Sequence, residues 1–342
     1  MPGHDVIVIG ASAGGVEALK QLVANLPADL PAAVCVVLHV SSHGTSVLPA
    51  ILRRAGRLPA EHVDAPQLLE PGRIYVAPPN KHLLIKSGFV SATHGATENG
   101  HRPAVDPLFR TAARTYGPGV IGVVLSGVLD DATAGLAAIK LRGGIAVVQH
   151  PEDAMYSGMP LSAIENVQVD HVVPVAEMAA LLVRLAREAA PEDDRSVPEN
   201  MQVESEIAEL DEDAMTREER PGKPSEFACP DCGGALWELS DGALFRFRCR
   251  VGHAYSAQTL LAEKMDSLED AFWVALRALE ESAALARRLA ERSKNHGSLR
   301  SAERFAEQAA EAEQRAAIVR EVLLNGRLNT LVGSEVEPDA NV

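Results

Sequence analysis

The amino-acid sequence predicts an α/β protein whose doubly wound, Rossmann-like parallel sheet is followed by a small zinc-ribbon-like module and an α-helical hairpin. Three observations support this prediction. Short β-branched runs alternate with amphipathic stretches in residues 1–190, three cysteines and a histidine gather in 226–256, and leucines recur at helical spacing in 257–330. Continuous apolar strands that alternate with helices are typical of a parallel sheet covered on both faces.

The strands of the predicted sheet are short apolar runs bounded by glycine, proline or polar residues. Two stretches between them, Gly15–Asn25 and Thr133–Arg142, have the apolar spacing of amphipathic helices, and Gly143 follows the second as a C-cap. Seven runs are predicted as strands, namely Val6–Ile9, Ala33–Leu38, Gly72–Ala77, His82–Lys86, Val120–Leu125, Ile145–Gln149 and His171–Pro174.

Charge and composition divide the chain further. A length of 342 residues suffices for about two domains. The formal net charge is −15, and residues 191–225 alone carry 12 Asp and Glu against 4 Lys and Arg. We therefore expect an acidic linker over 191–225, in which a helix over Met201–Met215 would be only transient. The negative charge also argues against a general nucleic-acid binder, because phosphate binding requires a basic surface.

The location of the protein is predicted from patterns that the sequence lacks. No apolar run reaches the roughly 18 residues of a membrane helix, and no basic region followed by a long apolar segment opens the chain. Four cysteines are too few for a disulfide scaffold in a chain of this length. We therefore expect a cytoplasmic protein that does not insert into membranes.

The first predicted strand runs into a glycine-rich turn, Gly10–Gly15, with Ser12 inside it. Such a turn either cradles a dinucleotide pyrophosphate through Gly-x-Gly-x-x-Gly or exposes a nucleophilic serine through Gly-x-Ser-x-Gly. The serine favours the second use, because a Cβ in place of the second glycine would obstruct the pyrophosphate. A dinucleotide site also needs an acidic residue about 20 positions on. The second strand ends instead in His39, which is suited to take a proton from Ser12.

A third group is needed to orient this histidine and to stabilise its cation. The strand Val120–Leu125 is followed by two carboxylates, Asp130 and Asp131. The carboxyl ends of neighbouring parallel strands meet at one edge of a sheet, where such folds place their sites. Spacing does not choose between the two aspartates. We expect one to cap the helix that begins near Thr133 and the other to orient His39.

Three cysteines and one histidine have the spacing of a structural metal site. They are Cys229, Cys232, Cys249 and His253. Two short knuckles separated by a hairpin-length insert suit tetrahedral zinc, whose four positions would all be filled by the protein. The insert is predicted to form a β-hairpin that turns at Asp241-Gly242, and so small a module needs its metal to fold. Cys35 lies inside a predicted strand and is expected to be a buried core thiol.

Several separate motifs along residues 4–185 resemble the catalytic domain of the chemotaxis protein-glutamate methylesterases, the CheB family. The resemblance covers just over half of the chain, and its motifs occur in the order that the family shows. The matching segments are Val8–Gly15, Leu38-His39, Tyr75–Pro78, Arg102–Phe109, Leu125–Gly127 and Gly158–Pro160.

The resemblance implies a Ser-His-Asp triad on a parallel, doubly wound sheet, with Ser12 as nucleophile and His39 as base. Of the two aspartates it selects Asp131 as the orienting carboxylate, by its spacing from the preceding Ser-Gly pair. It implies no cofactor for catalysis. Backbone N–H groups at Ala13 and Val128 would then stabilise the oxyanion.

The sequence departs from the family pattern around this aspartate. The family usually has Met and Gly after a Thr-Gly pair and Gly after the aspartate, whereas here Ser126-Gly127 precedes Val128-Leu129, and Ala132 follows the aspartate. These changes keep the backbone donors but alter the side chains beside them, which affects the expected substrate preference. The family's N-terminal receiver domain is not expected either, because the first catalytic strand begins near residue 5. The esterase would then be either constitutively open or controlled from elsewhere, and within the chain only the C-terminal third could exert that control.

The leading hypothesis is a serine carboxylesterase that hydrolyses glutamate γ-methyl esters of chemoreceptor-type helical proteins and releases methanol. Some relatives also deamidate glutamine, which the sequence leaves open. The alternative hypothesis is a signalling adaptor whose triad is vestigial and whose C-terminal module recruits partners. A nucleotide-binding protein is disfavoured by Ser12 and His39. The helical hairpin is expected to be a packing or dimerisation element.

Overall fold

The computed structural model describes residues 3–41, 44–210, 212, 214, 222–241 and 244–324. The chain forms two compact units, Met1–Leu260 and Leu261–Val342. The first unit contains both the predicted α/β domain and the cysteine-containing module, and the second contains most of the helical hairpin.

A seven-stranded parallel sheet forms the centre of the first unit, with the order β10-β9-β8-β1-β2-β5-β3. β2, β5 and β3 lie on one side of β1, and β8, β9 and β10 lie on the other. The connections after β1 and after β8 therefore lead to opposite sides of the sheet. Ligand sites of doubly wound folds lie at such a reversal, outside the carboxyl ends of the strands. The strands are β1 (Val6–Ala11), β2 (Ala33–Leu38), β3 (Ala60–His62), β5 (Ile74–Val76), β8 (Val120–Val124), β9 (Ile145–Gln149) and β10 (His171–Val173).

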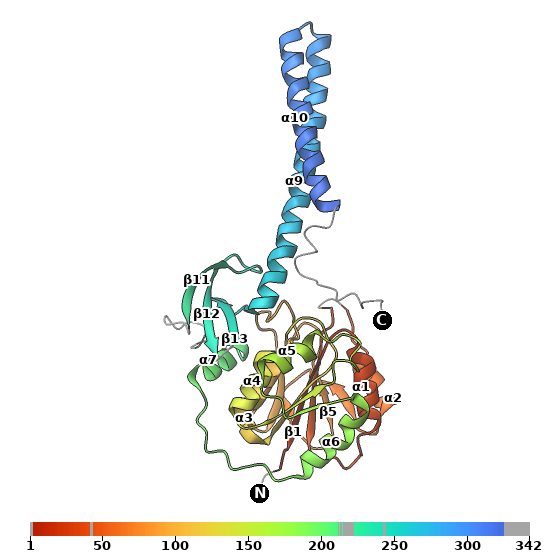
Figure 1. Ribbon diagram of the computed structural model, residues 1–342, viewed down its shortest axis with the longest axis vertical. Coiled ribbons are helices and arrows are strands. Elements are labelled where there is room, and N and C mark those ends of the chain that lie inside the picture. The colour runs from red at the N-terminus through yellow and green to blue at the C-terminus, as the bar shows by residue number, and fades with distance from the viewer. Residues whose placement is uncertain are drawn as a thin grey trace, which may run out of the picture. The chain divides into compact units, whose positions relative to one another are not determined.

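Helices cover both faces of this sheet, as Figure 1 shows. Alternation along β1 explains why both faces are apolar: Ile7 and Ile9 belong to one core layer, and Val6 and Val8 to the other, all at most 1% exposed. The first layer includes residues of α1 (Gly15–Ala24), α2 (Leu48–Ala55) and α6 (Val175–Arg187). The second includes residues of α3 (Val105–Tyr116), α4 (Thr133–Leu141) and α5 (Gly158–Asn166). The predicted doubly wound α/β class is therefore confirmed.

One predicted strand does not join the parallel sheet. The segment His82–Lys86 forms β6, which pairs antiparallel with β7 (Phe89–Thr93) in a separate three-stranded sheet completed by β4 (Gln67–Leu68). Gly88, with φ of +76°, makes the tight turn between β6 and β7. Only a short turn joins β6 to β7, whereas parallel strands need a crossover of a dozen or more residues. These two strands can therefore pair only antiparallel.

The cysteine-containing module is a four-stranded antiparallel sheet in the order β11-β12-β13-β14. Its strands are β11 (Lys223–Ala228), β12 (Ala235–Asp241), β13 (Leu244–Cys249) and β14 (Ala254–Ser256). β12 and β13 are the two strands of the predicted hairpin, and its predicted turn at Gly242 lies outside the described residues. The small core of the module consists of Cys229, Leu236, Phe247, Cys249, Tyr255 and Leu260.

The stretch 191–225, expected to be an acidic linker, contains the helix α7 (Glu199–Ala208). Glu204 in this helix is 1% exposed and forms ion pairs with Arg246 and Arg248 of β13. Part of the acidic composition therefore neutralises buried arginines of the module, which composition alone does not reveal. The transient helix expected over Met201–Met215 would end at Met215, which lies outside the described residues.

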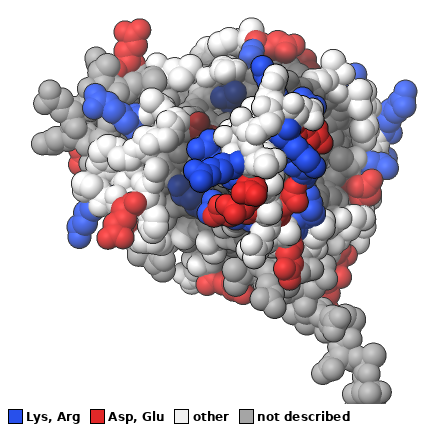
Figure 2. Space-filling view, turned by 90° about the horizontal axis from the view of Figure 1, so that it is seen from above, with Lys and Arg blue, Asp and Glu red and all other residues white. Residues whose placement is uncertain are grey.

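Two long helices, α9 (Ala257–Asn295) and α10 (Leu299–Leu324), form the predicted hairpin. They run antiparallel, because Arg287 pairs with Glu313 and Arg320 pairs with Glu280. Figure 2 likewise shows basic side chains next to acidic ones on the face that it draws. Among the described residues, no helix has the length and apolar character that a membrane span requires.

Candidate active site

The turn after β1 places Ser12 at the carboxyl edge of the sheet. Gly14 adopts φ of +72°, a left-handed conformation that favours glycine and lets the chain turn directly into α1. The Ser12 backbone N–H donates to the carbonyl of Ser126 at 2.9 Å, and its carbonyl accepts from Gly15 N–H at 2.9 Å. The first bond ties the serine to the loop that follows β8, and the second closes the turn before α1. The side chain of Ser12 is partly exposed.

His39 follows β2 and lies next to this turn. The parallel register pairs Ala11 with Leu38, and the N–H of His39 donates to the carbonyl of Ala11 at 3.1 Å. The His39 Nε2 atom lies 2.7 Å from Oδ2 of Asp131, with side chains only 7% and 3% exposed. Its Nδ1 atom is buried and has no hydrogen-bond partner in the described part of the chain. The ring stacks on His101 at a centroid distance of 3.8 Å.

Asp131 is held in place by hydrogen bonds from four donors. Oδ2 accepts from His39 Nε2 at 2.7 Å and from the Val105 N–H at 2.7 Å. Oδ1 accepts from Asn99 Nδ2 at 2.9 Å and from the Asp106 N–H at 3.3 Å. Burial alone would raise the pKa of Asp131, but the hydrogen bond and the charge interaction with His39 lower it below its usual value. The carboxylate is therefore ionised at neutral pH.

Of the two aspartates after β8, Asp131 contacts His39 as expected, whereas Asp130 does not have the expected role. The expectation that one of them caps the following helix is wrong, because Ala132 occupies the N-cap of α4 and no side chain bonds there. The Asp130 carboxylate points to the module instead, where it accepts hydrogen bonds from Ser256 Oγ at 2.8 Å and Thr259 Oγ1 at 2.9 Å. These donors lie far away in the sequence, so helix-cap reasoning does not anticipate them.

Ser12 and His39 lie at the ends of neighbouring strands, but hydrogen bonds do not join all three of Ser12, His39 and Asp131 in the described residues. No hydrogen bond joins the Ser12 side chain to His39 among the residues that the structure describes. The N–H groups of Ala13 and Val128 donate to no other described residue, so both are free to bind an oxyanion. Val128 is 44% exposed and lies in the loop joined to Ser12.

Three further residues surround the His39–Asp131 pair and were not identified from spacing. Asn99 bridges Asp131 and Asp106, since its Nδ2 also lies 3.0 Å from Asp106 Oδ2. Burial and the Asp131 charge raise the pKa of Asp106 to about 8. Burial and the neighbouring His39 lower the pKa of His101 to about 4, so its ring is neutral at pH 7.

The predicted metal ligands also gather at one point. The ligand atoms of Cys229, Cys232, Cys249 and His253 all lie within 4.8 Å of one another. Two sulfur atoms, Cys232 Sγ and Cys249 Sγ, are 3.8 Å apart, and His253 Nδ1 lies 3.4 Å from Cys249 Sγ and 3.6 Å from Cys229 Sγ.

These distances fit a tetrahedral metal. Zinc bonds of about 2.3 Å to sulfur and about 2.1 Å to nitrogen give edges of about 3.8 Å between sulfurs and about 3.6 Å between sulfur and nitrogen. The four side chains could therefore hold one metal ion with no open position. The remaining cysteine, Cys35, is fully buried in β2 as predicted, and burial raises the pKa of its thiol.

Fold and site together define a doubly wound α/β protein with a hydrolase-type site at the carboxyl edge of its sheet. Residues 7–182 match the family model of the CheB methylesterases. The chain belongs to the CheB methylesterase family.

Relatives of known name agree with this assignment. A putative protein-glutamate methylesterase/protein-glutamine glutaminase of Leptospira interrogans is 38% identical over 183 residues, which are 53% of this chain and 95% of that one. A protein of the same activity name from Moorella thermoacetica is 36% identical over 189 residues, but these make up only 45% of its length. The crystal structure of the Thermotoga maritima CheB methylesterase catalytic domain matches with a TM-score of 0.52 and 32% identity, over 54% of this chain and all of that domain.

Proposed function

We propose that this protein is a serine hydrolase that removes methyl groups from glutamate γ-methyl esters of chemoreceptor-type helical proteins and releases methanol. Ser12, His39 and Asp131 act as nucleophile, base and orienting carboxylate. The observation that carries the proposal is the buried contact of 2.7 Å between His39 Nε2 and Asp131 Oδ2, beside a serine on the adjacent strand end.

The tautomer of His39 follows from this contact. Because Asp131 is ionised, it accepts a proton-bearing Nε2, and the neutral ring then carries its lone pair on Nδ1. This is the buried atom without a partner. Nδ1 is therefore the atom that accepts the Ser12 proton. The missing hydrogen bond to Ser12 is compatible with this role, since catalytic hydrogen bonds often tighten only when substrate is bound.

The reaction proceeds in two halves. In the first, Ser12 Oγ attacks the ester carbonyl while its proton passes to His39 Nδ1, and the oxyanion is bound by the N–H groups of Ala13 and Val128. The tetrahedral intermediate then collapses, the His39 proton passes to the leaving methoxide, and methanol departs. In the second half, His39 takes a proton from water, the hydroxide attacks the glutamyl-serine ester, and the proton returns to Ser12 as the glutamate side chain is released as a carboxylic acid, which ionises in solvent.

The metal site has a separate, structural part in this proposal. Cys229, Cys232, Cys249 and His253 would hold a zinc ion, which cross-links the ends of a module too small to be stable by its core alone. All four ligands come from the protein, so the ion would take no part in ester hydrolysis.

The proposed activity is tested by methanol release from a methylated receptor fragment. We expect release by the wild-type protein and a loss of at least about a thousandfold in Ser12→Ala and His39→Ala. Ser301→Ala, on α10, is the control for the effect of an unrelated substitution. Equal methanol release by wild type and Ser12→Ala would refute the proposal. Failure of a serine-directed phosphonate to label Ser12 would favour an adaptor with a vestigial triad instead.

A further inference from the structure

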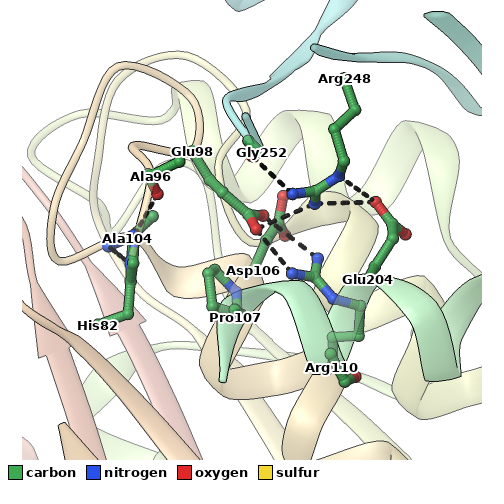
Figure 3. A network of polar contacts seen from close by, with 12 residues as sticks. His82, Ala96, Glu98, Ala104, Asp106, Pro107, Arg110, Glu204, Arg248 and Gly252 are labelled. Atoms are coloured by element: carbon green, nitrogen blue, oxygen red, sulfur yellow. Dashed lines mark hydrogen bonds and ion pairs between the residues drawn. The ribbon is translucent and has the colours of Figure 1, made fainter. Parts of the chain in front are cut away.

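A short loop, Thr97–His101, lies between the candidate catalytic residues and the cysteine-containing module. On one side, Asn99 donates to Asp131 and His101 stacks on His39. The base of the loop is fixed by His82, whose Nε2 bonds the carbonyl of Ala96 at 2.8 Å and is drawn in Figure 3. The loop is thus in direct contact with both members of the histidine–aspartate pair.

The other side of this loop is bonded to the module through backbone groups. The N–H of Asn99 donates to the carbonyl of Ala254 at 2.7 Å, and the N–H of Ala254 donates to the carbonyl of Thr97 at 3.2 Å. The N–H of Ser256 donates to Oδ1 of Asn99 at 2.8 Å. The amide of Asn99 is therefore fully used: its oxygen is held by the module and its nitrogen faces Asp131. This arrangement fixes the orientation of the amide.

A buried ion-pair network joins the same two parts, as Figure 3 shows. Glu98, 3% exposed, accepts from Arg110 of α3 at 2.8 Å and from Arg248 of β13 at 3.0 Å. Arg248 also donates to Glu204 at 2.9 Å and to the carbonyl of Gly252 at 2.7 Å. Buried charges are costly unless every partner is in place, so this network requires the module to be docked against the loop.

A second contact is made to Asp130, the residue before Asp131. Ser256 and Thr259 donate their hydroxyl groups to its carboxylate. Ser256 therefore contributes to both contacts, through its N–H to Asn99 and through its hydroxyl to Asp130. The short segment 254–259, from the end of the module and the start of α9, therefore contacts both Asn99 and the residue next to Asp131.

Two of the metal ligands are sequence neighbours of residues that make these contacts. Cys249 follows Arg248, and His253 precedes Ala254. The N–H of Cys249 donates to the carbonyl of His253 at 2.9 Å, which closes the short loop between the two ligands. A metal ion bound by both side chains would therefore fix the positions of the residues that contact Glu98 and Asn99.

We propose that the cysteine-containing module is a positioning element of the active site. With its metal bound, it holds Asn99 so that the side-chain amide orients Asp131, and through Asp131 the base His39. Loss of the metal releases Asn99 and lowers the reactivity of Ser12. The proposal rests on the proposed function for its catalytic consequence, whereas its structural half can be measured without any substrate.

The structural half is measured by hydrogen exchange on the full chain with and without zinc. A chelator should remove one zinc ion per chain and speed amide exchange in the peptides that contain Asn99 and Asp131. Peptides of α6, which packs in the other core layer from α3 and α4, serve as the internal control, and added zinc should restore protection. Unchanged exchange at both peptides after removal of the metal would overturn the proposal.

The catalytic half is measured by the rate at which a serine-directed phosphonate labels Ser12. Asn99→Gly is the diagnostic variant, because Asn99 has φ of +51°, which glycine adopts freely, so only the amide is lost. Asn80→Gly is the matched control, since Asn80 has φ of +62° and its amide bonds Arg102 rather than the catalytic residues.

We expect Asn99→Gly and metal removal each to slow the maximal labelling rate about tenfold, with the phosphonate concentration at half-maximal rate unchanged, and Asn80→Gly to change neither. A merely structural role for Asn99 would lower thermal stability without this selective loss of rate. Unchanged labelling in Asn99→Gly would overturn the inference and leave the proposed function intact. If the wild type itself is not labelled, the proposed function fails, and hydrogen exchange still decides whether the module holds Asn99.

Discussion

Replacement of Asp131 by asparagine tests the candidate triad most directly. The carboxylate presents two oxygens to two pairs of donors: Oδ2 to His39 Nε2 and the Val105 N–H, and Oδ1 to Asn99 Nδ2 and the Asp106 N–H. Asparagine offers only one oxygen, and its NH₂ group must take the other place. One pair of buried donors then faces a donor, whichever way the new amide is oriented.

Both orientations impair the base. If the NH₂ group faces His39, it donates to Nε2, and the ring proton moves to Nδ1, which can no longer accept the Ser12 proton. If the oxygen faces His39, the imidazolium formed during the reaction loses its negative partner. The same change in a serine-protease triad lowers kcat by about 10⁴. We therefore expect a loss of about 10³ to 10⁴, equivalent to about 4–5.5 kcal/mol, and a decrease of about 1–3 kcal/mol in the free energy of unfolding.

The assay combines methanol release with phosphonate labelling of Ser12 and urea unfolding. Asp130→Asn is the matched control: a half-buried neighbour whose Oδ1 alone accepts from Ser256 and Thr259, so the asparagine carbonyl can keep both bonds. Its rate should fall by less than about threefold. An Asp131→Asn protein that keeps its rate within threefold of wild type would refute the assignment of this carboxylate as the residue that orients His39.

Three further outcomes are expected. His101 has its ordinary pKa of 6.5 in the unfolded chain, whereas in the folded chain its pKa is lowered to about 4. Stability should therefore fall as the pH is lowered through this window, and His101→Phe should flatten that fall in urea titrations at several pH values. Glu204→Gln, which leaves buried arginines without their anion, should lower the free energy of unfolding by about 3–5 kcal/mol, whereas the exposed Glu199→Gln should change it by less than about 0.5 kcal/mol. Elemental analysis should find one zinc ion per chain, lost in Cys249→Ala and kept in Cys35→Ala.

Local patterns identified most of the architecture because they act over short distances. The glycine-rich turn after β1, the apolar alternation along the strands and the Cys and His spacing each reflect geometry within a few residues. Two exceptions are the short edge strand Ala60–His62, which the sequence did not predict, and His82–Lys86, which is a strand but belongs to a hairpin outside the main sheet. For His82–Lys86 the run of apolar residues is the same in either sheet, and only the pairing partner differs.

The candidate site was predictable in its main residues but not in their surroundings. Ser12, His39 and Asp131 stand at strand ends, where a doubly wound sheet directs its functional residues. Asn99 gives no such signal, because it lies in an irregular loop and its partners are far away in the chain. The role of Asp130 was misread for the same reason.

The sequence by itself determined the fold class, the family and the candidate site residues, because all three depend on residue type and on spacing along the chain. The tertiary structure decided how the acidic segment and the module are used. Glu204 neutralises buried arginines, and Ala254 and Ser256 hold the loop that contacts Asp131. Such contacts join residues more than 40 positions apart, and burial makes each of them matter, since a buried charge or amide must find a partner wherever the folded chain supplies one.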